Sequence, residues 1–190
     1  MIDRMKESRK LTHGWFVLPD RPGDRTLEQQ LEGLSPLLAE VDGKSVLDVG
    51  CAEGLISHEC ARRGAILVHG IEFVGSAVAK ARELTGDLPC DFFHDDANIY
   101  EPKLRYDIVL LLAVLHKLVN PTEACIRLAS AAKELCVVRM GLTGKETIID
   151  GRSGSNAHYI GRTMRQRGFE MVQMTQGPLS EETWYYRRKT

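Results

Sequence analysis

The sequence predicts an α/β fold built on a doubly wound, mostly parallel sheet of about seven strands. From 46 to 138, apolar runs of strand length alternate with segments of helical periodicity, which is typical of parallel strands joined by right-handed crossovers. The run Ile108–Leu112 is apolar throughout, as expected for a central strand that helices cover on both faces. After Gly168 two strands follow one another around a turn at Gly177-Pro178, which predicts a C-terminal antiparallel hairpin.

Local patterns predict the individual elements. Two short helices are expected ahead of the first strand, and Asp24 or Thr26 caps the one that runs from Leu27 to Leu34. Ser35-Pro36 then supplies the N-cap and first-turn proline of the helix Leu37–Val41. The remaining elements are, in order, a strand from Val46, a helix from Leu55 with Gly64 as its C-cap, strand Ile66–Ile71, helix Ser76–Leu84, strand Asp91–His94, strand Ile108–Leu112, helix Pro121–Lys133, strand Cys136–Val138, a helix that Ser155 caps and that ends near Gly168, and strands Phe169–Met174 and Thr183–Arg188.

Composition and charge argue against several classes of protein. The formal net charge is −1 and the isoelectric point is about 6.6, so no overall positive field favours nucleic acid. The five cysteines form no C-x-x-C pair and no metal-ligand spacing, which predicts reduced, mostly buried thiols and no metal site. Residues 1–10 are charged, and no apolar stretch is long enough to span a membrane, so we expect a cytoplasmic protein without a signal peptide.

The stretch that most constrains function is Val46-Leu47-Asp48-Val49-Gly50-Cys51-Ala52-Glu53-Gly54, a strand that enters a helix through a turn of small residues. Glycines let a ligand approach the backbone closely, and a helix N-terminus offers unpaired N–H groups. A dinucleotide site carries no carboxylate at this mouth, because a pyrophosphate sits there. Asp48 makes the mouth anionic, which suits a ligand with a cation such as an amino-acid ammonium. Glu72, at the end of the next strand, is placed to bind ribose hydroxyls, so the two acids together indicate S-adenosylmethionine.

At these residues, and from about Val46 to Leu118, the chain resembles the class I S-adenosylmethionine-dependent methyltransferases. The resemblance implies a Rossmann-like fold with S-adenosylmethionine as the cofactor. The chain departs from the family's usual pattern at Ala52 and Asp95, where glycine is common. The cofactor-binding residues expected within this range are Asp48, Gly50, Cys51, Ala52, Gly54, Glu72, Phe73, Asp96, Ala97 and Leu112. Arg25, in the N-terminal segment, is a further candidate for the cofactor.

The resemblance also distributes these residues over the cofactor. Asp48 and the Gly50–Gly54 turn would hold the methionine part, and Glu72 would bind the ribose. Asp96 would accept a hydrogen bond from the adenine amino group while the N–H of Ala97 faces the ring. Leu112 and Ala113 would form the wall beside the reacting methyl group.

Methyl transfer from a sulfonium is an in-line displacement with a neutral leaving group. The protein therefore mainly aligns the nucleophile with the methyl, and holding both partners supplies roughly 7–11 kcal/mol of the barrier. An acceptor hydroxyl or ammonium also needs a base to take its proton. His116 lies just past the fourth strand, and its free pKa of about 6.5 makes it the candidate catalytic residue. A structural role for His116 is an equal alternative.

We expect the acceptor to be a small molecule that is methylated on oxygen or nitrogen, and the protein to be a monomer or homodimer. Methylation of a nucleic-acid base is not favoured, because the chain has no Asn-Pro-Pro-Tyr-type tetrad. A tRNA methyltransferase that binds through scattered arginines remains an alternative, as does a partner subunit that binds the cofactor without catalysis. Polar residues in or beside the long connection after Gly141 would line the acceptor site; they are Lys145, Arg152, His158 and Tyr159.

The expected single methyltransferase domain spans 1–190. It comprises an N-terminal segment with two helices (1–45), a cofactor-binding core (46–140), and an acceptor loop, helix and hairpin (141–190). Within the first part, the Trp15–Arg25 stretch resembles a segment that lies over the cofactor mouth in some small methyltransferases. We therefore hypothesise a lid in which Trp15 or Phe16 excludes water and Arg21 or Arg25 lies near the cofactor carboxylate. In the alternative, the segment packs on the far side of the sheet.

Overall fold

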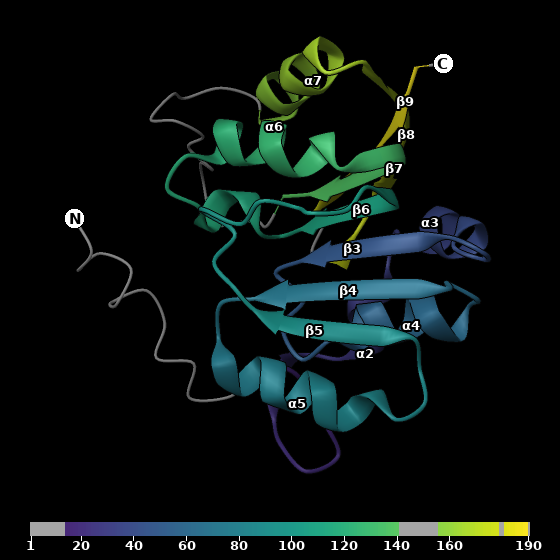
Figure 1. Ribbon diagram of the computed structural model, residues 1–190, viewed down its shortest axis with the longest axis vertical. Helices are drawn as coiled ribbons and strands as arrows, with labels where there is room; N and C mark the ends of the chain where they lie inside the picture. The colour runs from purple at the N-terminus through teal and green to yellow at the C-terminus, as the bar shows by residue number, and fades with distance from the viewer. Residues whose placement is uncertain (1–13, 141–155, 179–180, 190) are drawn as a thin grey trace.

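The computed structural model describes residues 14–140, 156–178 and 181–189 (Figure 1). Their centre is a seven-stranded sheet with the order β5-β4-β3-β6-β7-β9-β8. Only β9 runs antiparallel to its neighbours, β7 and β8, so the predicted mostly parallel sheet with a C-terminal hairpin is confirmed. The strands are β3 (Ser45–Val49), β4 (Leu67–Glu72), β5 (Cys90–His94), β6 (Tyr106–Leu112), β7 (Ala132–Arg139), β8 (Phe169–Gln176) and β9 (Glu182–Arg188).

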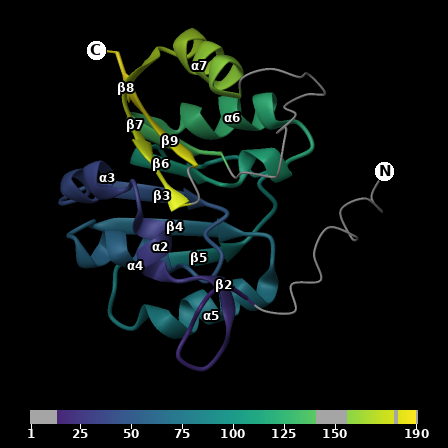
Figure 2. The ribbon, with the colours of Figure 1, turned by 180° about the vertical axis from the view of Figure 1, so that it is seen from behind.

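Helices cover both faces of this sheet, as Figures 1 and 2 show from opposite sides. One face packs against the helices α2 to α5, and the other against α6 and α7. Their bounds are α2 (Leu27–Leu31), α3 (Ser35–Glu40), α4 (Leu55–Arg62), α5 (Gly75–Thr85), α6 (Pro121–Ser130) and α7 (Asn156–Gln166), with a short 3₁₀ helix η1 (Leu115–Lys117) after β6. None of the helices in the described ranges is long and apolar enough to cross a membrane.

The central strands are apolar on both faces because each face has its own core. Ile108 and Leu110 of β6 belong to the cluster under α2–α5, whereas Val109 and Leu111 belong to the cluster under α6 and α7. Alternate side chains of a strand point to opposite faces, so burial on both sides requires a continuous apolar run. All five cysteines are buried as free thiols, as predicted.

The boundary between α6 and β7 corrects the sequence prediction. The helix was expected to reach Lys133, but it ends at Ser130, and β7 begins at Ala132 rather than Cys136. Ala132 pairs with Tyr106 of β6, and its carbonyl accepts hydrogen bonds from Arg188 at 2.7 and 3.0 Å. Partners from distant parts of the chain thus outweigh the local helix propensity of this alanine-rich stretch.

The N-terminal region holds a feature that the sequence analysis did not anticipate. The strands β1 (Gly14–Phe16) and β2 (Gly23–Arg25) form a small parallel sheet apart from the main one. Phe16 and Leu18 are buried in the core under α2–α5. The capping box that Thr26 makes with Gln29 confirms Thr26 as the cap of α2.

A buried arginine at the end of β7 connects the end of α2 to β9. Arg139, the last residue of β7, is fully buried, and its guanidinium donates to the Gln30 carbonyl and the Thr183 hydroxyl, each at 2.8 Å, and to the Glu32 carbonyl. Burial lowers the pKa of Arg139 to about 10, which leaves it charged at neutral pH. Its backbone carbonyl accepts from the N–H of Ala113 at 2.7 Å and so fixes the end of β6.

Candidate functional site

The glycine turn at the carboxyl end of β3 has a backbone that few residues tolerate. Gly50 and Gly54 have φ of 75° and 76°, and a Cβ at either position would lie within 3 Å of Val114 or Phe92. Ala52 between them has φ of 49°, a left-handed conformation that is uncommon for alanine. Both glycines are therefore required by conformation and by space, and Ala52 holds its position under strain.

The N–H groups of this turn bond to the protein rather than face the mouth. Gly50 and Cys51 donate to the Ile71 carbonyl at 2.8 and 3.1 Å, and Ala52 donates to the Glu72 carboxylate at 3.0 Å. Gly54 donates to the Cys51 carbonyl at 2.9 Å. A phosphate cradle needs such groups unbonded and aimed at the ligand, so this turn is not built as one.

Asp48 lies beneath the turn at the end of β3 and is 3% exposed. Its carboxylate accepts a hydrogen bond from the Ser57 hydroxyl at 2.6 Å. Burial, with a smaller contribution from nearby Glu72, raises the pKa of Asp48 to about 6, although the Ser57 bond lowers it. A cation beside this carboxyl would favour its ionised form.

Glu72 at the end of β4 is held by two backbone groups, one on each oxygen. Its Oε2 accepts from Ala52 and its Oε1 accepts from Val74, at 3.0 and 2.9 Å. Each carboxylate oxygen can accept a second bond, so the side chain can still meet a pair of ligand hydroxyls. The next residue, Phe73, exposes its ring, and its carbonyl lies 2.9 Å from Nε2 of His94.

Asp96 lies in the loop that follows β5. Its Oδ1 accepts from the backbone and side-chain nitrogens of Asn98 at 2.9 and 2.8 Å. Its backbone carbonyl accepts from Ile99 and Tyr100, which closes the loop into a compact turn beside buried Ala97. Its Oδ2 accepts no hydrogen bond from the described residues, so this oxygen remains for a ligand.

The loop after β6 carries the remaining predicted residues. Leu112 is half-buried at the strand end, and Ala113 has φ of 53°, the second left-handed alanine at this edge of the sheet. His116 follows in η1 and is also half-buried. Since β5, β4, β3 and β6 are adjacent and parallel, their carboxyl ends bring Asp48, Glu72, Asp96 and Leu112 to one edge.

Comparison with known proteins decides the kind of domain. Residues 46–134 match a family model described as a methyltransferase domain. These residues form a class I methyltransferase domain. The ubiquinone biosynthesis O-methyltransferases of Citrobacter koseri and Saccharophagus degradans are 29% identical over 114 residues and 34% identical over 100 residues. These matches cover 56% and 50% of this chain but only 47% and 42% of those proteins, so the chain spans less than half of their length.

Solved structures show the same fold for the methyltransferase domain. The magnesium protoporphyrin IX methyltransferase from Synechocystis with bound S-adenosylmethionine superposes with a TM-score of 0.68, at 21% identity, over 85% of this chain and 80% of that one. A putative methyltransferase in complex with the Trm112 activator of Haloferax volcanii gives a TM-score of 0.69 at 13% identity, with coverages of 86% and 91%. The predicted Rossmann-like fold of S-adenosylmethionine-dependent methyltransferases is thus confirmed.

Glu53 is a residue of the methyltransferase domain that sequence reasoning missed. It stands in the glycine turn, is 1% exposed, and accepts from the backbone N–H groups of Trp15 and Phe16 at 2.9 and 3.2 Å. It also pairs with the guanidinium of Arg21. The N-terminal segment therefore lies against the glycine turn, and a signal for this was present in the arginine-containing turn that follows Phe16.

Three further contacts place the segment across the ends of the strands. Asp20 pairs with Lys80 of α5 at 2.7 Å, and Nζ of Lys117 lies 4.8 Å from the centre of the Trp15 ring. Arg25, predicted near the cofactor carboxylate, directs its guanidinium to the buried Glu181 at 3.1 and 3.3 Å. Its predicted role at the cofactor stays a prediction.

Arg21 provides a second cation in the same segment. Its Nε is buried and has no hydrogen-bond partner within the parts of the chain that the structure describes. The segment thus holds one buried donor for an anionic group. Of the residues predicted to line the acceptor site, His158 and Tyr159 lie in α7, whereas Lys145, Arg152 and the rest of the long connection lie outside the described residues.

Proposed function

We propose that the protein is an enzyme that transfers a methyl group from S-adenosylmethionine to an oxygen or nitrogen of a small-molecule acceptor. One observation carries the proposal. Three acids, Asp48, Glu72 and Asp96, stand at the carboxyl ends of the adjacent strands β3, β4 and β5. Their order across the sheet matches an ammonium, a ribose and an adenine amino group laid along one edge.

The residues present fit this cofactor. Asp48 would attract the ammonium, and the turn Gly50, Cys51, Ala52 and Gly54 would lie along the methionine chain. Glu72 is already oriented by two backbone N–H groups, so it would meet the ribose hydroxyls without further ordering. Asp96 and the N–H of Ala97 would bind the adenine edge, with Phe73 beside it. When bound, the cofactor supplies an electrophilic methyl and a neutral leaving group.

The cofactor carboxylate has two candidate partners in the N-terminal segment. Arg21 pairs with Glu53 and Arg25 pairs with Glu181, but Arg21 also carries a buried Nε that no described residue binds. We assign the carboxylate to Arg21 first and keep Arg25 as the second candidate. The segment would act as a lid, because it crosses the strand ends and would exclude water from the charges beneath it.

The reaction itself asks little covalent chemistry of the protein. Leu112 would border the methyl and the acceptor would approach from beyond β6, where His116 stands at the start of the following turn. His116 would accept the acceptor's proton as the nucleophile attacks. The named relatives are O-methyltransferases, which supports an oxygen acceptor.

Calorimetry with S-adenosylhomocysteine tests the cofactor assignment. The wild-type protein should bind it, and Asp48→Ala and Glu72→Ala should each weaken binding by roughly tenfold to a hundredfold, because each removes a charged hydrogen bond worth about 1.5–3 kcal/mol. A folded wild-type sample that releases no heat contradicts the proposal. Turnover with any acceptor distinguishes an enzyme from a partner subunit that only binds the cofactor.

His116 has its own test once an acceptor is found. As a general base, its loss in His116→Ala should lower kcat by about 10²–10⁴-fold and leave the affinity for S-adenosylhomocysteine unchanged. A fully active His116→Ala variant would make this residue structural.

A further inference from the structure

The loop 96–100 is held from outside by one side chain. Arg127 of α6 donates from Nη2 to the carbonyls of Ala97 and Asn98 at 2.7 and 2.8 Å. Its Nε donates to the carbonyl of Tyr100 at 2.9 Å. The Arg127 side chain is only 13% exposed, so a single guanidinium satisfies three backbone carbonyls in a largely dry setting.

These bonds determine which groups of the loop face a ligand. The carbonyl of Asp96 is also occupied, since it accepts from the N–H groups of Ile99 and Tyr100 at 3.0 and 2.8 Å. The N–H and C=O of one peptide group point in opposite directions, so the N–H of Ala97 points away from the interior of this turn. The carbonyls of Asp96, Ala97, Asn98 and Tyr100 are thus all occupied, and the N–H groups of Asn98, Ile99 and Tyr100 bond to Asp96. The loop therefore presents the N–H of Ala97 and the carboxylate of Asp96 to a ligand.

We propose that Arg127 is a positioning residue for recognition of the adenine base. By binding the carbonyls of Ala97, Asn98 and Tyr100, it holds the N–H of Ala97 and the Oδ2 of Asp96 in the one arrangement that reads the amino edge of the base. This inference rests on the proposed function for the identity of the base. The three bonds from Arg127 to the loop, here called the clamp, are present in the ligand-free chain and can be tested without any cofactor.

Only arginine suits this position. Its guanidinium is a planar fork whose donors point in fixed, separate directions, which lets Nε and Nη2 reach carbonyls on different residues. A lysine ammonium concentrates its donors on one atom and cannot span from Asn98 to Tyr100. Arg127→Lys should therefore behave as a partial loss, and Arg127→Met as a complete loss of the clamp.

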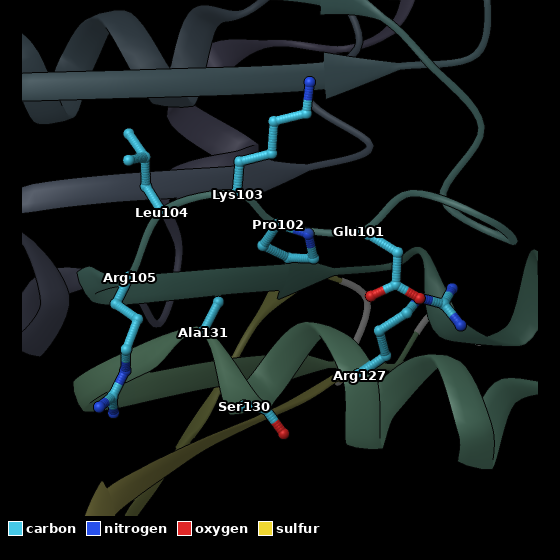
Figure 3. A pocket seen from close by; sticks show the side chains of 8 residues that line it. All are labelled: Glu101, Pro102, Lys103, Leu104, Arg105, Arg127, Ser130 and Ala131. Atoms are coloured by element: carbon cyan, nitrogen blue, oxygen red, sulfur yellow. The ribbon is translucent and has the colours of Figure 1, made fainter.

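The chain offers a matched control in Arg105. Both arginines line a shallow pocket of about 250 Å³ between α6 and the segment before β6, and Figure 3 shows them on opposite sides of it. Arg105 donates to the Ala132 carbonyl at 3.3 Å, outside the loop 96–100. Arg105→Met makes the same substitution in the same pocket, with the same loss of charge, but it leaves intact the three bonds from Arg127 to the loop.

Hydrogen exchange of the ligand-free protein tests the clamp directly. The amides of Asn98, Ile99 and Tyr100 bond within the loop and report its opening. Arg127→Met should raise their exchange rates at least tenfold, Arg127→Lys less, and Arg105→Met should leave them as in the wild type. Unchanged exchange in Arg127→Met overturns the proposal. If that variant does not fold, Arg127→Lys carries the same comparison.

Base discrimination tests the consequence for recognition. The probes are S-adenosylhomocysteine and S-inosylhomocysteine, in which an oxo group replaces the adenine amino group. Arg127→Met and Arg127→Lys should reduce the preference for the adenine ligand at least fivefold, whereas Arg105→Met should retain it. Asp48→Asn should weaken both ligands by the same factor, because it acts at the other end of the cofactor.

The two experiments distinguish a failure of the proposed function from a failure of the Arg127 proposal. A wild-type protein that binds neither ligand overturns the proposed function, and the exchange rates alone then decide whether Arg127 positions the loop. A wild-type preference that both Arg127 variants keep in full overturns the proposal, because a merely structural residue would change stability without changing the ratio of the two affinities.

Discussion

The two turns that we assign to the cofactor are held in place in opposite ways. The glycine turn Gly50–Gly54 is held through its N–H groups, which donate to the Ile71 carbonyl and to the carboxylate of Glu72. The loop 96–100 is held through its carbonyls, which accept from Arg127. These bonds decide which polar groups are left for a ligand. The carboxylates at the glycine turn leave a site that suits a cation, and the guanidinium of Arg127 leaves the N–H of Ala97, which suits an acceptor atom of a base.

Neutralising Asp48, the acid beneath the glycine turn, should have the largest effect of the changes considered, and the effect should be on ligand affinity. Asp48→Asn removes the negative charge but keeps the shape, so affinity for S-adenosylhomocysteine should fall by roughly tenfold to a hundredfold. Wild-type affinity should also fall as the pH drops through about 6, because protonated Asp48 no longer attracts the ammonium. Calorimetry between pH 5 and 8 checks this, and the variant should lose that pH dependence.

The same variant should gain stability when no ligand is bound. The folded-state pKa of Asp48 is raised from 3.8 to about 6, so the folded protein holds this proton more tightly than the unfolded chain. Its contribution therefore favours folding at low pH and is lost as the pH rises through about 6, at a cost of at most about 3 kcal/mol at neutral pH. The melting temperature of Asp48→Asn at pH 7.5 should exceed that of the wild type. A lower value would mean that the charged form is not penalised.

Neutralising Glu53, the carboxylate within the glycine turn, should have an intermediate effect, and the effect should be on stability. Glu53→Gln leaves Arg21 without its charged partner and weakens the bonds to Trp15 and Phe16, which should cost about 1–3 kcal/mol of stability. Limited proteolysis near Pro22-Gly23 should become faster, and S-adenosylhomocysteine should protect the wild type better than the variant. Equal cleavage of the wild type with and without ligand would remove the lid from the proposal.

A control for the Glu53 variant lies on the next helix. Glu59→Gln also removes one negative charge, but from surface ion pairs with Arg62 and Arg63 at 3.8 and 2.9 Å. Such pairs contribute about 0–1 kcal/mol. A variant of Glu59 as damaging as that of Glu53 would show that charge balance, rather than the hold on the N-terminal segment, matters.

The smallest effect is expected from the strained alanine of the glycine turn. Ala52→Gly relieves a left-handed conformation that costs alanine about 1–2 kcal/mol, but glycine loses roughly 0.5–1 kcal/mol more entropy on folding. The net gain should be below about 1 kcal/mol by thermal unfolding. Ala77→Gly in α5, where the backbone is helical, should instead destabilise the protein. Loss of stability in both variants would mean that Ala52 is not strained.

The sequence predicted most reliably the features that local residues determine. Asp48, the two glycines and the first helix follow one another within a few residues, and their geometry is a local consequence of small side chains at fixed spacing. The apolar run of β6 likewise predicted that this strand is buried on both faces. Parallel pairing then carried the prediction further, because it brought Glu72 and Asp96 to the same edge as Asp48.

Features that depend on distant partners were not predictable. The first half of β7 has the composition of a helix, and only its pairing with Tyr106 and the bonds from Arg188 make it a strand. Glu53 occupied a position in the turn that small-residue spacing leaves open, so nothing in the glycine turn itself revealed that its carboxylate binds a segment 37 residues earlier. The signal lay instead in the arginine-containing turn that follows Phe16. The role of Arg127 could not be predicted either, because its three carbonyl partners lie 27 to 30 residues earlier in the chain, before β6.

The buried Arg139 has a consequence for how the protein is made. Its guanidinium bonds to a carbonyl of α2 more than one hundred residues earlier and to a hydroxyl 44 residues later in the chain. While the polypeptide is being synthesised, that charge has no complete set of partners until β9 has emerged. Domains generally fold as units, and an unsatisfied charge in the core is costly to bury. A shortened gene that ends after β7 keeps Arg139 but lacks Thr183, so its product should not fold. A fluorescent folding reporter fused after β9 should mature where one fused directly after β7 does not.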